Sequence, residues 1–215
     1  MRKRILKNNR ALSRCLGVAL TVLLFTSAIA LCSCESDLGE ANAALAEANE
    51  YQKEAEAILL RFKSFSSDWE SIFESGRIGP EQLSAANQLI EQREADFEAL
   101  QETLKKWEDK WKYIQGLNLR AELQEYTKLK LDSVKCWRDY CDGCLLPLIK
   151  SYKGLVKLMS SGKSGAELSA KAAEIASYME ASKAKLDECR AAEKQADDFF
   201  IEKKLGKIGG SEKEK

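Results

Sequence analysis

PEQLSAANQLIEQREADFEALQETLKKWEDKWKYIQ, residues 80–115, decides the fold. Its apolar side chains recur at alternating steps of three and four residues, the spacing of a helix that packs lengthwise against another helix. Arg93 is the one charged member of this series. The full series is Leu83, Ala86, Ile90, Arg93, Phe97, Leu100, Leu104, Trp107, Trp111 and Ile114. The stretch therefore predicts one long amphipathic helix.

Two further stretches, about residues 37–75 and 166–205, repeat this spacing. In the last of them Glu193 is the charged exception. The first series is Leu38, Ala41, Leu45, Ala48, Gln52, Ala55, Leu59, Phe62, Ser66, Trp69 and Phe73. The last series is Leu168, Ala172, Ile175, Met179, Ser182, Leu186, Cys189, Ala196 and Phe200. Both stretches predict long helices with coiled-coil-like packing.

Helix-breaking residues separate these stretches. Turns are predicted at residues 76–80, where Pro80 suits the first position of a helix, and at residues 160–165. Residues 116–118 mark a weaker break. A remaining helical stretch, about residues 119–159, contains Gly143 and Pro147, so we expect a kink or a short interruption there.

Folding the chain about its first turn tests this arrangement. A hairpin centred near residue 77 places residue i opposite about residue 155 − i, so Trp107 faces Ala48 and Trp111 faces Ala44. Bulky side chains then meet small ones, as a packed seam requires. We predict an all-α fold: an elongated antiparallel bundle of about four long helices over residues 34–205, with a disordered charged tail at 206–215.

Composition excludes several classes of function. The chain has no histidine, which excludes Ser-His-Asp and Cys-His catalysis and the commonest zinc sites. No pattern indicates a catalytic residue, a cofactor or a metal site, so an enzyme is not expected. Six of the 34 basic residues lie in residues 1–14, so the rest of the chain carries 28 basic and 34 acidic residues. An acidic domain is a poor candidate for binding nucleic acid.

The first 34 residues have the order of an export signal: a basic segment at 1–14, an apolar run at 15–31, and the tetrapeptide Leu31-Cys32-Ser33-Cys34. This ending resembles the lipobox of bacterial lipoproteins. The resemblance implies a signal peptide at 1–33, cleavage after Ser33, and a diacylglycerol on Cys34. It also implies that the lipid bilayer holds the protein through the acylated Cys34, on the extracytoplasmic side, in the periplasm or at the cell surface.

Two other interpretations of this segment remain. Lipidation of Cys32 would place Leu31 where a small residue is expected. An uncleaved membrane anchor would use the apolar run of about 17 residues, the short limit for a spanning helix. The anchor would still place residues 35–215 outside the cytoplasm, because the basic cluster stays inside.

Four further cysteines suggest disulfides, since an exported chain meets oxidising conditions. A second hairpin, centred near residue 162, places residue i opposite about residue 325 − i, which brings Cys189 opposite Cys136. We predict Cys136–Cys189 first and Cys141–Cys144 second. Cys141–Cys189 is the main competing pair, and four free buried thiols are the alternative.

The same cysteines also permit two specific chemical roles, an iron–sulfur site and a redox motif. Their spacing copies that of a plant-type iron–sulfur protein, and Cys141-Asp142-Gly143-Cys144 resembles a redox Cys-x-x-Cys motif. The helical context favours neither. A set of aromatic side chains could line a ligand groove, although core packing is the commoner role of residues at this spacing: Trp69, Trp107, Trp111, Trp137, Tyr126, Tyr140 and Tyr152.

These patterns predict a membrane-anchored lipoprotein whose helical bundle is a spacer or an interaction module in the cell envelope. Its partners would be envelope proteins or cell-wall material. Small helical cell-wall-binding lipoproteins have a similar architecture, without a shared motif. The alternatives are a small-molecule-binding or thiol/disulfide redox-active envelope protein, and an oligomeric coiled-coil assembly.

Overall fold

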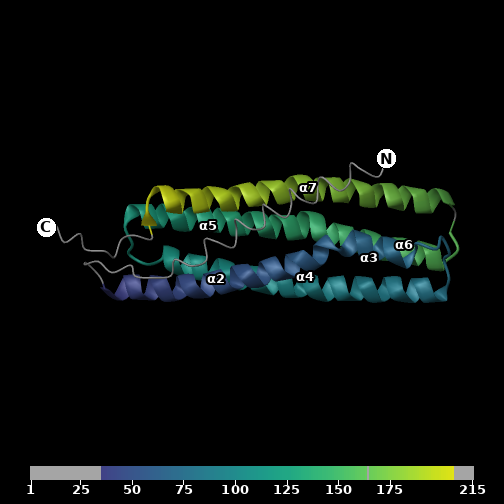
Figure 1. Cartoon of the computed structure of the whole chain (residues 1–215), viewed down its shortest axis with the longest axis horizontal. Coiled ribbons are helices and arrows are strands. Elements are labelled where there is room, and N and C mark those ends of the chain that lie inside the picture. Colours follow the sequence, from purple (N-terminus) through teal and green to yellow (C-terminus); the bar gives the residue numbers. More distant parts are fainter. Residues whose placement is uncertain (1–34, 164, 206–215) are drawn as a thin grey trace, which may run out of the picture.

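The computed structural model describes residues 35–163 and 165–205, which form an elongated all-α bundle, as predicted. The signal segment, Cys34 and the tail at 206–215 lie outside the described residues. The elements run lengthwise beside one another (Figure 1). They are α2 (Glu35–Lys63), α3 (Phe65–Ile72), α4 (Pro80–Gln115), α5 (Ala121–Tyr140), the π-helix η2 (Cys141–Leu145), α6 (Leu146–Ser160) and α7 (Gly165–Glu202).

The first predicted helix is divided in two, which corrects the expectation of one helix to about residue 75. The chain turns at Ser64, between α2 and α3. The Ser64 hydroxyl lies 3.1 Å from the carbonyl oxygen of Arg61 and 2.8 Å from a carboxylate oxygen of Asp68. Serine side chains offer such local bonds in place of regular helical ones, so they weaken a helix interior.

The boundaries of α4 agree with the prediction. Gly76 has a φ of +68°, which suits glycine, and it reverses the chain before α4. Pro80 occupies the first helical turn, and the Gln82 side chain accepts a hydrogen bond of 3.2 Å from the amide of Gly79. Gly116 follows the last residue of the helix. Local turn chemistry therefore explains both ends.

The predicted interruption near Gly143 and Pro147 is the π-helix η2, which joins α5 to α6 without a turn. Proline has no amide hydrogen, so Pro147 cannot complete the bond that a regular helix would make to the carbonyl of Gly143. Such single π turns occur inside longer helices, often at functional sites. The third predicted helix is thus continuous in direction but altered in its side-chain register.

The two hairpins pack in the predicted registers. The ammonium of Lys110 lies 2.5 Å from a carboxylate oxygen of Glu47, and the hydroxyl of Tyr113 donates a bond of 2.6 Å to Glu40. Their residue numbers add to 157 and 153, against the expected 155. In the second hairpin, Ser151 donates a bond of 2.7 Å to Glu174, whose numbers add to the expected 325. Both hairpins are therefore antiparallel as predicted.

The helices do not share the core equally. α4 packs against α2, α5 and α6, whereas α7 packs mainly against α5 and α6. All members of the predicted α4 series except Leu83 are buried. On α2 the buried face is wider than predicted, because Ala44 and Ile58 are buried outside the series. A helix in a bundle covers its neighbours with flanking positions as well as the two central ones.

The bundle has two distinct ends (Figure 1). One, the α2 end, holds the start of α2, the connection at 116–120 and the end of α7. The other, the turn end, holds the connections at 73–79 and 161–163. Because α4 has 36 residues, these ends are about 54 Å apart along that helix.

Candidate functional site

The predicted disulfide between Cys136 and Cys189 is present and joins α5 to α7. Their Cα atoms are 5.3 Å apart, inside the range that a disulfide requires. Cys189 is fully buried and Cys136 is 7 % exposed. The hairpin register brought these two positions together, so this pairing was predictable from the sequence.

The second predicted disulfide is wrong, because Cys141 and Cys144 are free and buried. Both lie in η2, where the helical backbone sets the directions of their side chains. A disulfide requires two side chains that converge, and positions three apart in a helix do not readily provide this. Burial, with Asp142 and Cys144 nearby, raises the pKa of Cys141 to about 12. The thiolate needed for disulfide exchange is therefore scarce.

The iron–sulfur interpretation is also contradicted, since Cys136 and Cys189 are joined to each other. Within residues 35–163 and 165–205, no group of three or more cysteine, aspartate or glutamate side chains is arranged to hold a metal ion.

Three of the four tryptophans are buried in the core and do not line an open groove. Trp107, Trp111 and Trp137 are 2 %, 1 % and 6 % exposed. A pocket at the α2 end has a volume of about 30 Å³ and an almost wholly apolar lining that includes Trp111 and Phe200. This space suits about a single water molecule, whereas an engineered cavity that binds benzene measures about 150 Å³. This pocket is therefore too small for a larger organic ligand.

A cluster of polar side chains lies where α2, α5 and α7 approach one another. We call it the Glu193 cluster. Lys130 of α5 is 3 % exposed, and its ammonium lies 2.7 Å from a carboxylate oxygen of Asp197 on α7. It also lies 5.9 Å from the centre of the Tyr126 ring. The cluster consists of Gln52, Glu56, Tyr126, Lys130, Glu193 and Asp197.

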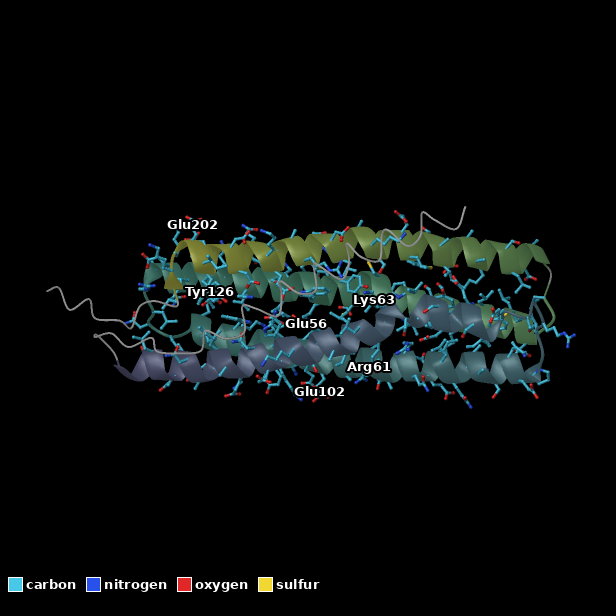
Figure 2. The ribbon with its side chains drawn as sticks, viewed as in Figure 1. Glu56, Arg61, Lys63, Glu102, Tyr126 and Glu202 are labelled. Carbon is cyan, nitrogen blue, oxygen red and sulfur yellow. A yellow bond between two sulfur atoms is a disulfide. The ribbon has the colours of Figure 1, made fainter. Side chains whose placement is uncertain are left out.

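Glu193 connects this cluster to α2. The Gln52 amide donates one hydrogen bond to the carboxylate of Glu193 and another, of 3.0 Å, to Glu56. Figure 2 shows Glu56 between the ribbons of α2 and α5, whereas Glu102 lies on the opposite, outer side of α4. Two carboxylates of the cluster therefore share one amide at the boundary between α2 and α7.

Burial dominates the electrostatics of the cluster. Burial raises the pKa of Glu193 to about 7, and the nearby Glu56 and Asp197 also raise this pKa. Lys130 and the hydrogen bond from Gln52 lower it. Burial alone would lower the pKa of Lys130, but Tyr126, Asp197 and Glu193 more than offset it and raise that pKa. Lys130 is therefore a buried ammonium, while Glu193 changes charge near neutral pH.

A second charged cluster holds the junction of α2, α3 and α4. Arg93 donates to Asp96 at 2.6 Å and to Asp68 at 3.2 Å, and Arg61 donates to Asp96 at 2.7 Å. Arg93 is 8 % exposed and its guanidinium lies 6.0 Å from the ring centre of Phe65. Arg93 thus ties α3 to α4 where the chain turns at Ser64, and Arg61 ties α2 to the same Asp96 carboxylate. Such links are expected of a residue that sets register.

In the sequence, Arg93 and Glu193 stand out as charged exceptions in apolar series, whereas Lys130 was not predicted as a site residue. Lys130 is flanked on one face of α5 by Tyr126, Ser133 and Trp137, all buried. The signal in the sequence that could have identified Lys130 is a charged residue at a position spaced to lie on this buried face. Its partner, Asp197, lies 67 residues away in the chain, so only the folded structure identifies the pair.

No helix in the described part of the chain is long and apolar enough to cross a membrane. The chain matches no protein-family model, no curated protein and no solved structure.

Proposed function

We propose that the protein is a membrane-anchored extracytoplasmic lipoprotein whose helical bundle acts as a spacer or interaction module in the cell envelope. The observation that carries the proposal is the position of α2, which begins at Glu35, directly after the lipobox-like tetrapeptide. A lipid on Cys34 would thus attach to one end of the bundle without an intervening linker.

The shape of the bundle supports a role as a spacer. Because α2 begins at the anchored end, the turn end would project about 54 Å from it along α4. The buried disulfide and the charged junction at Arg93 join helices along this length. The turn end carries Ile78, which is 55 % exposed, and so offers an apolar contact to an envelope protein or to cell-wall material.

The alternative functions gain less support. A redox role would require accessible thiolates, but Cys141 and Cys144 are buried and burial raises the pKa of both. A role in binding organic ligands would require a larger pocket than the one at the α2 end.

Metabolic labelling with an alkyne analogue of palmitate tests the anchor. We expect the wild-type chain and Cys32→Ala to be labelled and to fractionate with membranes. We expect Cys34→Ala to lose the label. Label that persists in Cys34→Ala but disappears in Cys32→Ala would move the lipid to Cys32. Membrane retention without label in any variant would refute lipidation and indicate an uncleaved anchor.

Photocrosslinking in the native membrane separates the two roles of the bundle. A photoreactive residue replaces Ile78 at the turn end or Tyr113, 48 % exposed, near the α2 end. An interaction module predicts discrete adducts from position 78 that are absent from position 113. A pure spacer predicts no discrete adduct from either position.

A further inference from the structure

The boundary between α2 and α7 differs from the other lengthwise boundaries of the bundle. α2 packs closely along α4, and α7 packs closely along α5 and α6, but the backbones of α2 and α7 stay farther apart. Figure 1 shows α7 along one long side of the molecule and α2 along the other. Side chains, not close helix packing, therefore hold this boundary together.

Glu193 occupies this boundary and meets α2 through the Gln52 amide. Charged or titratable groups approach it from three elements: Glu56 on α2, Lys130 and Tyr126 on α5, and Asp197 on α7 itself. Lys130 is already paired with Asp197 at 2.7 Å. An ionised Glu193 thus shares one ammonium with Asp197 and faces two like charges.

Protonation changes this balance. A neutral Glu193 keeps its hydrogen bond from Gln52 and faces no repulsion from Glu56 or Asp197. An ionised Glu193 must be held in a partly buried site where the nearby cation, Lys130, is shared with Asp197. The sign follows from the raised pKa of Glu193, about 7 against an ordinary 4.5. The closed boundary binds the proton more tightly than an open, hydrated one, so rising pH between these values favours opening.

We propose that the α2–α7 boundary is a proton-controlled latch, closed when Glu193 is protonated and weakened when Glu193 is ionised. The latch acts by loosening α2 from α7 in the middle of the bundle. The disulfide remains intact and keeps α7 joined to α5. This inference does not depend on lipidation of Cys34, so it and the proposed function are tested separately.

Hydrogen exchange measured by mass spectrometry on the full chain in detergent micelles tests the latch. Protection factors, corrected for intrinsic exchange, are compared for peptides from the middle of α2 and from α4. If opening restores an ordinary carboxyl pKa, protection in α2 should fall roughly thirty-fold between about pH 5.5 and pH 8. Protection in α4 should change much less.

Glu193→Gln is the central variant, because the amide keeps the shape of the side chain and is neutral at every pH. We expect its α2 protection to stay constant across this range. Glu180→Gln is the matched control: Glu180 lies on α7, 79 % exposed and paired with Lys183. It should retain the wild-type pH dependence.

Glu56→Gln provides a second measurement that does not depend on the stability of Glu193→Gln. Removing this neighbouring negative charge should lower the pKa of Glu193 and move the midpoint of the transition to lower pH. The proposal is overturned if wild-type α2 protection is independent of pH, if Glu193→Gln keeps the wild-type transition, or if Glu56→Gln leaves the midpoint unchanged.

Discussion

α4 and α7 have almost the same length, 36 and 38 residues, and similar apolar spacing in the sequence. They differ in burial: twelve residues of α4 are buried, but only Ile175, Cys189 and Ala196 of α7. The difference arises from position, since α4 has helices on several sides and α7 lies at the edge. Equal spacing therefore does not mean an equal share of the core.

The comparison also shows that the two helices are held by different forces. α4 contributes large buried side chains such as Trp107 and Trp111, whose burial is the main source of stability. α7 depends more on specific links: the Cys189 disulfide, the Lys130–Asp197 ion pair and the Ser182 hydroxyl, which donates to Tyr140 at 3.1 Å. Four sets of substitutions test this division.

Trp107→Ala should have the largest effect, a loss of about 3–5 kcal/mol in the free energy of unfolding, because it leaves a large cavity in the core. The matched change on α7 is Ile175→Ala, which should cost nearer to about 2 kcal/mol, the lower limit for such truncations. Urea denaturation measures both. Equal losses would show that α7 contributes as much to the core as α4.

Replacing both Cys136 and Cys189 with serine should remove up to about 4 kcal/mol, since the disulfide closes a loop of 53 residues. Amide protection should fall more in α7 than in α4. The control, Cys141→Ala with Cys144→Ala, breaks no covalent link and should cost much less. A larger loss in the control would mean that packing in η2 outweighs the disulfide.

Asp197→Ala should cost about 2 kcal/mol, because the buried Lys130 loses a charge-assisted hydrogen bond. Lys130→Met should cost less, since the Asp197 side chain is 36 % exposed and can be hydrated instead. Thermal or urea unfolding of both variants gives the order. The opposite order would indicate that the carboxylate depends on the pair more than the ammonium does.

Lys183→Ala should have the smallest effect, within about 0.5 kcal/mol, because surface ion pairs contribute little. Lys183 and its partner Glu180 are 72 % and 79 % exposed. A larger loss, measured by the same denaturation, would mean that the outer face of α7 is stabilised by its charges.

Elements governed by local chemistry were predictable from the sequence. The limits of α4 follow from Gly76, Pro80 and Gly116, and the interruption in the third helix follows from Gly143 and Pro147. The break at Ser64 was not predicted, because one serine is tolerated in many helices. There its effect depends on Asp68, which Arg93 of α4 holds from across the bundle.

The candidate site was predictable only in part, for the same reason. The register of the second hairpin identified Cys136 and Cys189, since both positions follow from the centre of one turn. Cys141 and Cys144 were assigned wrongly because their geometry depends on η2, whose altered register is not visible in the spacing. The predicted role of Cys34 stays a prediction, because that residue lies outside the described residues.

The sequence alone predicted the helical class, the turns, the antiparallel registers and one disulfide. These features are predictable because periodicity and turn chemistry act over short distances along the chain. Tertiary structure decided which helix lies at the centre, which charged residues are buried, and that Lys130, Glu193 and Gln52 meet. These outcomes depend on how the two hairpins pack together. That packing brings together side chains from distant parts of the chain, and it sets their burial and therefore their charge.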